Sequence, residues 1–262
     1  MEDPVLLARH DGWAKVTLNR PDRMNALNTD VHAALAAIFA ELADDSACRA
    51  VVLTGNGRGF CSGQDLVDAA AIASSGVFDL GEEIERSYNP LIRRLRSMPK
   101  PLICAVNGIA AGAGASLALA GDIVLAAKSA SFQQSFVRIG LIPDAGSTWA
   151  LPRLVGDARA RALTMLAEPV CAEQAEAWGM IWRCVSDESL QSEADALAAK
   201  LARMPTQALA MIKQALNAGL SSGLDAQLDL ERDLQRKAGY TADFAEGVAA
   251  FIGKRMPNFS GT

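Results

Sequence analysis

The first 127 residues alternate between short apolar runs and longer segments in which apolar positions recur every three or four residues. Short apolar runs predict buried strands, and the longer spacing predicts helices that bury one face. Strands are expected at 5–9, 13–19, 50–53, 102–106 and 123–127, and helices at 28–44, 82–97 (interrupted or kinked near Pro90) and 112–120. Asp11-Gly12 is a hairpin turn signal between the first two strands. Alternation of strands and helices indicates an α/β fold.

Beyond Gly156 the pattern changes to nearly continuous helical periodicity. Helices are expected at 157–167, 172–177, 188–203, 206–218, 224–237 and 242–252, with a short strand at 181–185. Gly219 is a plausible stop for the fourth of these helices. Because no long linker divides the chain, we expect one unit. It would consist of an α/β core over residues 1–200 and a helical region over residues 201–262.

Residues 101–121 carry no charged side chain, and Gly108 and Gly112 form the G-x-x-x-G pattern known from membrane helices. The glycines, Asn107 and Ser116 lower the hydropathy of this segment. A buried strand followed by a buried helix therefore fits better than a membrane span, and no membrane partner is expected.

The charge balance is acidic, with 25 Lys and Arg against 30 Asp and Glu, so the chain as a whole does not attract nucleic acid. The two histidines, His10 and His32, both lie near the N-terminus. This disfavours a Ser-His-Asp triad or a multi-histidine metal site, and proton transfer is expected from carboxylates. The five cysteines form no C-x-x-C pair, and no signal-peptide pattern precedes them. A reducing cytoplasm, with cysteines acting mostly as core residues, is the natural interpretation.

Two loops of small residues, 58–66 and 107–116, each follow a predicted buried strand. Small residues let a ligand approach backbone N–H groups, and the second loop opens a helix, whose N-terminus adds partial positive charge. Two such loops side by side could hold one carbonyl oxygen and stabilise an enolate. The alternative is that the glycines only form tight turns.

Asp122 and Asp144 are the two acidic residues between Pro101 and Gly156. Asp122 precedes a strand and is expected to accept hydrogen bonds from nearby backbone N–H groups. Asp144 allows two interpretations that the residues alone leave open. It could cap a helix that begins near Ala145, or act as a general base in a dry pocket, where desolvation raises the pKa of a carboxyl group.

These features resemble the crotonase superfamily of enoyl-CoA hydratases and isomerases. The resemblance covers nearly the whole chain and is carried by residues 18–27, 60–66, 100–114, 140–143 and 246–257. It implies a ββα spiral core with a helical C-terminal trimerisation region. It also implies an acyl-CoA substrate, no cofactor beyond the CoA of that substrate, no metal, and a homotrimer or dimer of trimers.

The resemblance also implies roles for individual residues. The backbone N–H groups of Gln64 and Ala113 would hold the thioester oxygen, next to Gly112. Further contacts to substrate or CoA are implied at Arg23, Ala26, Ser62, Asp65, Leu66 and Val67. Phe251 and Lys254 fall where a neighbouring subunit often reaches the same CoA, and Lys254 would supply positive charge for its phosphates.

Two departures change the reaction that is expected. The glutamates of the superfamily's hydratases correspond to Ser116 and Phe136, which disfavours hydration. Asp144 remains as the acid/base, at or near a position that some isomerases of the superfamily use. Residues 85–95, 140–144, 178–182 and 227–232 further resemble bacterial isomerases that convert ring-1,2-epoxyphenylacetyl-CoA to oxepin-CoA in phenylacetate degradation. The chemistry also resembles Δ3- to Δ2-enoyl-CoA isomerisation. Ser147 replaces a glycine of many relatives, which is expected to affect the shape of the pocket.

Three alternatives remain beside the isomerase hypothesis. One is an enoyl-CoA hydratase. Another is a dehalogenase or thioesterase with Asp144 as nucleophile, which would want a nearby base, although His10 and His32 are distant in sequence. The third is a member that binds RNA or serves as a scaffold, for which a basic patch and loss of the carboxylate would be expected.

Overall fold

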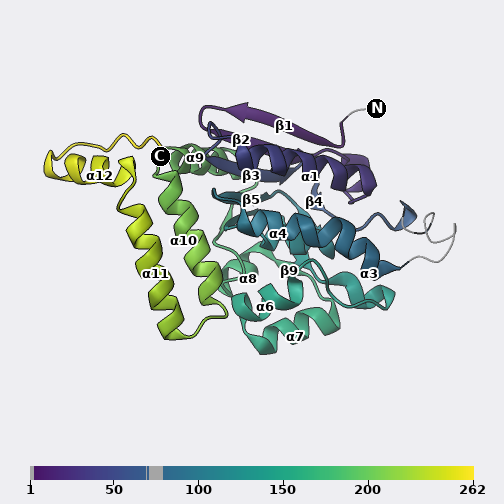
Figure 1. Ribbon diagram of the computed structural model, residues 1–262. Coiled ribbons are helices and arrows are strands. Elements are labelled where there is room, and N and C mark those ends of the chain that lie inside the picture. Colours follow the sequence, from purple (N-terminus) through teal and green to yellow (C-terminus); the bar gives the residue numbers. More distant parts are fainter. Residues whose placement is uncertain (1–2, 69, 71–78) are drawn as a thin grey trace.

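The computed structural model describes residues 3–68, 70 and 79–262, and its strands form two sheets (Figure 1). The larger sheet has the order β1 (Val5–His10), β2 (Trp13–Leu18), β3 (Ala50–Gly55), β5 (Leu102–Val106), β7 (Ile123–Ala127) and β10 (Arg183–Val185). The smaller sheet has the order β4 (Gly59–Cys61), β6 (Ile109–Ala111), β8 (Ser131–Gln133) and β9 (Val170–Cys171). β1 is antiparallel to β2 and β9 to β8, whereas the other neighbours are parallel.

From β3 onwards each turn of the chain places one strand in the larger sheet and the next strand in the smaller one. β3 is followed by β4, β5 by β6, and β7 by β8. β3 and β5 are buried along their whole length, which explains why they read as continuous apolar runs instead of alternating ones. This ββα spiral confirms the expected fold class.

The chain also contains helices between and around the sheets. They are η1 (Pro21–Arg23), α1 (Thr29–Asp44), α3 (Leu80–Glu83), η2 (Ile84–Tyr88), α4 (Asn89–Ser97), α5 (Ala113–Leu119), η3 (Ser135–Ile139), α6 (Ser147–Val155), α7 (Asp157–Leu166), α8 (Ala172–Ala177), α9 (Leu190–Ala202), α10 (Thr206–Gly219), α11 (Leu224–Ala238) and α12 (Ala242–Ile252). All seven residues of α5 are buried, and the helix contacts strands of both sheets. A helix without a polar face belongs in such a position.

Some predicted elements differ from the observed ones. The helix expected at 82–97, with an interruption or kink near Pro90, begins at Leu80 and is interrupted as expected: it consists of α3, the π-helix η2 and α4, and Pro90 lacks an N–H and crowds the preceding turn. The strand expected at 181–185 is limited to β10. The short strands of the smaller sheet were not predicted, since runs of two or three residues carry no readable periodicity. The division at residue 200 stays a prediction.

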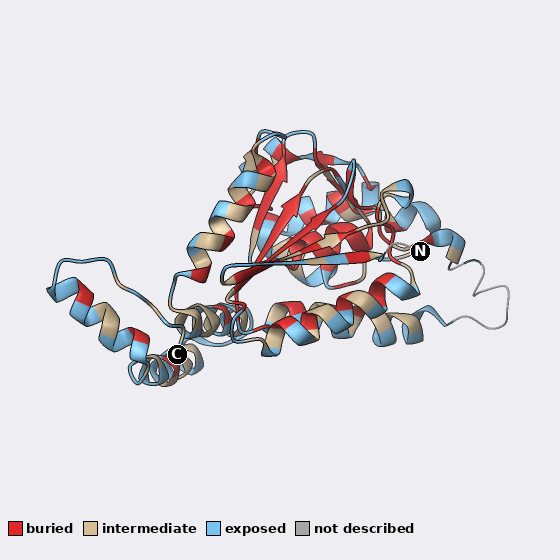
Figure 2. Ribbon diagram, turned by 90° about the horizontal axis from the view of Figure 1, so that it is seen from above, coloured by how far each residue is buried: buried red, intermediate tan, exposed pale blue. Residues whose placement is uncertain are grey.

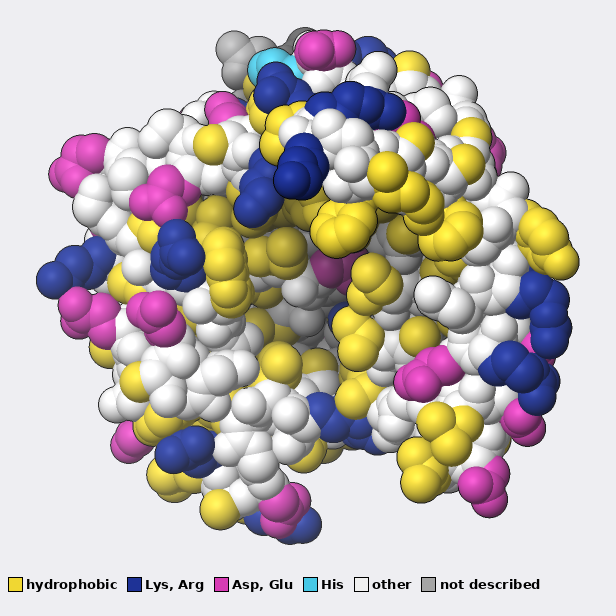
Figure 3. All heavy atoms as spheres, turned by 90° about the vertical axis from the view of Figure 1, so that its left-hand side faces the viewer, with side chains coloured by type: hydrophobic (Ala, Val, Ile, Leu, Met, Phe, Trp, Pro, Cys, Tyr) yellow, Lys and Arg dark blue, Asp and Glu magenta, His cyan; other side chains and the backbone are white. Residues whose placement is uncertain are grey.

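The α/β part and the C-terminal helices differ in burial. Buried residues concentrate on the strands and the helices packed on them, whereas most residues of the C-terminal helices α10 to α12 are exposed or intermediate (Figure 2). On the side of the molecule formed by α10 to α12, apolar side chains surround a hollow (Figure 3). Exposed ones on these helices include Ile212, Leu216, Leu228, Phe244 and Phe251.

Two expectations from composition can be compared with the coordinates. Cys48, Cys61 and Cys104 are buried, as expected of core residues, whereas Cys171 is exposed. Among the helices that the structure describes, none combines the length and the apolar character needed to span a bilayer.

Candidate active site

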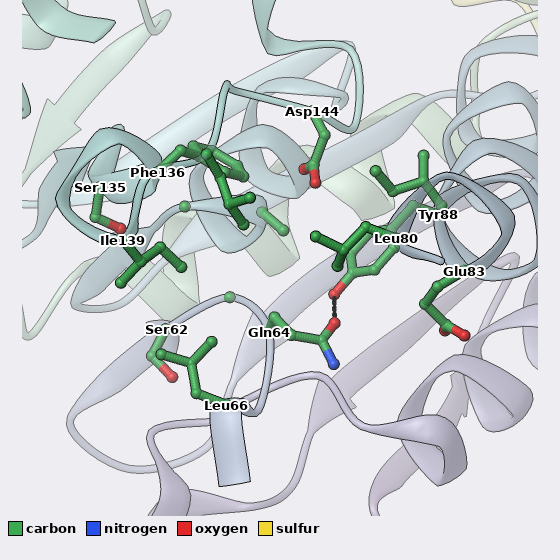
Figure 4. A pocket seen from close by; sticks show the side chains of 15 residues that line it. Ser62, Gln64, Leu66, Leu80, Glu83, Tyr88, Ser135, Phe136, Ile139 and Asp144 are labelled. Carbon is green, nitrogen blue, oxygen red and sulfur yellow. Dashed lines mark hydrogen bonds between the residues drawn. The ribbon is translucent and has the colours of Figure 1, made fainter. Parts of the chain in front are cut away.

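A pocket of about 130 Å³ lies where the two small-residue loops meet η2 and η3 (Figure 4). Gly63, Gly112 and Ala113 contribute backbone to its wall. Its polar side chains are Ser62, Gln64, Glu83, Tyr88, Ser135 and Asp144. Its apolar side chains are Leu66, Leu80, Ile84, Phe136, Ile139 and Leu141. The pocket therefore combines a dry wall with a few convergent polar groups, as ligand sites do.

The two loops lie directly against each other. Gly63 has φ +89°, and a Cβ placed on it would come within 2.8 Å of the Ala111 carbonyl oxygen and 3.2 Å of the Ala113 nitrogen. Gly114 is equally constrained, because its Cβ would overlap the Cys61 carbonyl. Glycine at both positions allows a backbone approach that a side chain would block. Close packing of the two loops thus accounts for glycine at both positions, and the role of the loops in ligand binding stays a prediction.

Gln64 and Ala113 occupy neighbouring positions at this contact. On either side of Gln64, the Gly63 carbonyl accepts the Leu27 N–H at 2.7 Å and the Asp65 N–H donates to the Leu27 carbonyl at 2.9 Å. Ala113 is the first residue of α5, after Gly112 at φ +52°. Within the described ranges, neither the Gln64 N–H nor the Ala113 N–H donates a hydrogen bond. These two N–H groups thus border the pocket and could donate hydrogen bonds to a substrate oxygen bound there.

Asp144 reaches the pocket from the loop after η3 (Figure 4). Its Oδ1 atom is buried, and no described residue offers it a hydrogen-bond partner. Burial raises the pKa of this carboxyl group from 3.8 to about 6. The capping interpretation is wrong, because α6 begins at Ser147 with Gly146 as N-cap and no side-chain cap. Asp144 instead starts a tight turn in which its carbonyl oxygen accepts the Ser147 N–H at 3.0 Å.

Behind this turn, two buried serines join α5 to α6. Ser116 Oγ and Ser147 Oγ are 2.6 Å apart, and Ser116 Oγ also donates to the Asp144 carbonyl oxygen at 3.2 Å. Neither serine lines the pocket. Ser147 therefore supports the Asp144 turn and does not set the width of the pocket directly. Phe136, for which the resemblance implies the position of the second hydratase glutamate, adds an apolar ring to the wall.

Glu83 is a second carboxylate in the pocket wall, and its surroundings differ from those of Asp144. Glu83 forms an ion pair with Arg86 and accepts the Ser87 hydroxyl at 2.6 Å. Both Glu83 oxygens are thus engaged by neighbouring side chains, whereas Asp144 Oδ1 has no partner among the described residues. Of these two, Asp144 is the better candidate base.

The other predicted contacts are distributed around the pocket mouth. Ser62 and Leu66 line the pocket, whereas Val67 is exposed and lies outside its lining. The Asp65 carboxylate pairs with Arg20 at 2.9 Å and accepts the Val67 N–H, so its role within the chain is structural.

Arg23 is exposed and Ala26 is buried, just before the bridge between Leu27 and Gln64. Phe251 and Lys254 are exposed at the end of α12 and do not meet the pocket within one chain. The structure thus brings together Gln64, Ala113 and Asp144 and leaves the C-terminal pair apart.

Sequence reasoning missed Tyr88, Glu83 and Ser135, although all three line the pocket. Tyr88 lies within the helix expected at 82–97, where its ring fits an apolar helix face. The one available signal was chemical, since a buried tyrosine hydroxyl normally needs a hydrogen-bond partner. Its partner, Gln64, is 24 positions away and could not be identified from spacing.

Comparisons with known proteins agree with this architecture. The family model described as enoyl-CoA hydratase/isomerase matches residues 8–262. The chain is 54% identical over the full length of both sequences to 1,2-epoxyphenylacetyl-CoA isomerase of Escherichia coli (strain K12). It is 50% identical, over 96% of this chain and 95% of the relative, to a probable enoyl-CoA hydratase of Rhodobacter capsulatus. A crystal structure of an enoyl-CoA hydratase from Polaromonas sp. JS666 matches with a TM-score of 0.90 and 35% identity, over 97% of this chain and 99% of that one. The chain therefore belongs to the enoyl-CoA hydratase/isomerase family.

Proposed function

We propose that the protein is a CoA-thioester isomerase that converts ring-1,2-epoxyphenylacetyl-CoA to oxepin-CoA and also shifts Δ3-enoyl-CoA double bonds to Δ2. The observation that carries the proposal is that Asp144 Oδ1 lies in the same pocket as the Gln64 and Ala113 backbone N–H groups, and none of the three has a hydrogen-bond partner among the described residues. Identity of 54% to an epoxide isomerase supports the choice of substrate.

In this mechanism the Gln64 and Ala113 N–H groups donate hydrogen bonds to the thioester oxygen and make the α-carbon more acidic. Asp144 removes one α-proton, and the electron pair of the C–H bond moves into the enolate. For a Δ3-enoyl substrate, Asp144 returns that proton to C4, which leaves the double bond conjugated with the thioester. The Δ3- and Δ2-enoyl thioesters are isomers, so this reaction consumes no further reactant. For the epoxide, the ring C–C bond that carries the epoxide oxygen breaks to give the seven-membered oxepin, and Asp144 transfers the α-proton to a ring carbon, so that the product is an isomer of the substrate.

The rest of the pocket favours isomerisation over hydration. Ser116 is directed to Ser147 and the Asp144 carbonyl, so it does not replace the missing hydratase carboxylate. Phe136 makes the other side apolar. A cavity of about 130 Å³ is comparable to the apolar cavity of about 150 Å³ that accepts benzene, so a ring-sized acyl group fits the space.

The proposal is tested by offering the purified protein three CoA thioesters and separating the products by liquid chromatography with mass detection. We expect conversion of ring-1,2-epoxyphenylacetyl-CoA and of a cis-3-enoyl-CoA, and no addition of water to a trans-2-enoyl-CoA. Hydration of the third substrate, without conversion of the other two, would contradict the proposal. A covalent adduct on Asp144 would favour the nucleophilic alternative.

We further propose that the protein forms a homotrimer or a dimer of trimers through the side carrying α10 to α12. Support comes from the apolar side chains exposed there, since patches of this kind mark protein contacts (Figure 3). In such an assembly Phe251 and Lys254 would reach a neighbour's CoA. Light scattering after size exclusion should give three or six times the mass of one chain, and a monomer would contradict this part of the proposal.

A further inference from the structure

Tyr88 lies in the pocket wall but has no part in the proton transfer described above. Its ring is buried, with 5% of the residue exposed, and its hydroxyl donates to Gln64 Oε1 (Figure 4). Gln64 is also the residue whose backbone N–H faces the proposed oxyanion. The hydrogen bond therefore connects a buried side chain on one wall with the oxyanion-hole loop on the other.

We propose that Tyr88 is a positioning residue of the oxyanion hole, which holds the Gln64 peptide in place through the Gln64 side chain. This inference rests on the proposed function, because it assigns a task to the oxyanion hole of that reaction. Tyr88 does not touch the reacting atoms in this scheme, and its effect on rate passes entirely through Gln64.

The Gln64 backbone is held from two sides, but its side chain has one support. Leu27 pairs with the peptides that flank Gln64, and Gly63 packs on the backbone of residues 111–113. In the portion of the chain that the structure covers, the Gln64 amide forms one hydrogen bond, to Tyr88. Loss of that bond would free the side chain to rotate and let the loop shift. Oxyanion stabilisation depends on donors that are fixed before the reaction begins, so such a shift should reduce the rate.

Tyr88 is itself held in a defined place. It is the last residue of the π-helix η2, a type of turn that often occurs at functional sites, and Pro90 follows two positions later. The His32 ring of α1 packs edge to face on the Tyr88 ring, with centroids 4.3 Å apart. Burial lowers the pKa of His32 to about 4, so this ring is uncharged at neutral pH and supports the Tyr88 ring by packing against it.

The test is a double-mutant cycle on the full-length protein with Tyr88→Phe, Gln64→Ala and the double variant. Gln64→Ala keeps the backbone N–H and removes the acceptor. Tyr240→Phe is the matched control, because it changes the other tyrosine, which is 85% exposed. Two readouts are needed: kcat and KM for a cis-3-enoyl-CoA, and the absorption band of bound 4-dimethylaminocinnamoyl-CoA. That conjugated thioester absorbs at longer wavelength when its carbonyl is polarised by hydrogen bonds.

We expect each single variant to lower kcat about three- to tenfold, the equivalent of one hydrogen bond, with a smaller change in KM. Both should reduce the red shift of the bound thioester, and the double variant should be no worse than the more impaired single variant. Tyr240→Phe should match wild type. A purely structural role of Tyr88 would lower the melting temperature and leave the red shift unchanged, which would overturn the proposal.

Other outcomes also decide the question. Effects of Tyr88→Phe and Gln64→Ala that multiply in the double variant would show that they act independently and would overturn the proposal. If wild type produces the red shift but converts neither substrate class, the proposed reaction fails while the red shifts of the variants still decide the role of Tyr88. If wild type produces no red shift, the oxyanion assignment and the role of Tyr88 fail together. Should Tyr88→Phe not fold, Gln64→Ala alone must reduce the red shift for the proposal to stand.

Discussion

Asp122 and Asp144 belong to the same nearly uncharged part of the chain but lie in contrasting surroundings. At the start of β7, Asp122 Oδ2 accepts the Leu102 N–H and the Lys213 ammonium, each at 2.8 Å. In the pocket, Asp144 Oδ1 has no partner among the described residues, and burial raises the pKa of its carboxyl group to about 6. Asp122 thus has an ammonium and a backbone N–H as partners, whereas burial of Asp144 penalises its charged form.

The contrast separates a structural acid from one suited to chemistry. Lys213 reaches Asp122 from α10 and also donates to the Leu95 carbonyl at 2.8 Å, so this ion pair fastens a C-terminal helix to the α/β core. Among the residues that the structure describes, no ion pair joins the Asp144 carboxylate to another element. Burial of the Asp144 carboxylate costs stability, but a proton acceptor with a pKa of about 6 is useful at a catalytic site.

The largest expected effect comes from Asp144→Asn, which keeps the shape of the side chain and removes the base. We expect kcat for either substrate to fall by about 10³, in the range of general-base losses, with little change in substrate affinity. Steady-state kinetics and a binding titration with substrate measure the two quantities. Activity within tenfold of wild type would contradict the assignment of Asp144. The same chemical change at Asp122 is the control.

Asp122→Asn should show the opposite behaviour. Lys213 would lose its carboxylate while it remains mostly buried, and we expect the free energy of unfolding to fall by about 2 kcal/mol. That is below the cost for a fully buried pair, because the Asp122 side chain is 21% exposed. Activity per folded molecule should stay within about twofold of wild type. Denaturant titration measures the first quantity, and a loss of turnover in fully folded protein would remove the distinction between the two acids.

The sequence predicted the strands of the larger sheet and most helices because these elements are long enough to show a period. α12 was predicted at its observed bounds, and α8 likewise. The smaller sheet was not predicted, because β9 has two residues and β4 has three, and the pairing of these strands depends on contacts distant in sequence. The glycine loops were predicted to come together, but the Cβ contacts that require Gly63 exist only in the folded backbone.

The same limit applies to the pocket. Elimination of charged residues led to Asp122 and Asp144, yet the residues could not decide between a cap and a base for Asp144. Only the position of the turn after Asp144, with α6 starting at Ser147, decides against the cap. The hydrogen bond between Tyr88 and Gln64 joins two segments whose proximity no periodicity predicts.

A pH series sharpens the comparison further. With a carboxyl pKa of about 6, Asp144 is the required base only when ionised, so kcat/KM should fall about tenfold per pH unit below 6. Stability should move the other way. Folding raises the pKa of this group above 3.8, so the folded state binds the proton more tightly, and the Asp144 contribution to the free energy of unfolding is lost as pH rises from about 4 through 6.

Denaturant titrations of wild type and Asp144→Asn at several pH values isolate that contribution. The difference in free energy of unfolding, wild type minus variant, should become more negative between pH 4 and 7 and then level off. A difference that is constant with pH, together with a flat kcat/KM profile, would mean that the Asp144 pKa is not raised by folding.

The smallest expected effect concerns Ser147→Ala, which removes one partner of the serine pair behind the Asp144 turn. Ser116 Oγ keeps the Asp144 carbonyl at 3.2 Å and the Gly112 carbonyl at 3.3 Å as acceptors, so no buried donor is abandoned. We expect the free energy of unfolding to fall by about 1 kcal/mol, and kcat to fall a few-fold as the turn loosens. Calorimetry and steady-state kinetics measure both. Because Ser147 supports Asp144 and does not line the pocket, the preference between the ring epoxide and a linear enoyl substrate should not change. A changed preference would show that Ser147 controls the shape of the pocket after all.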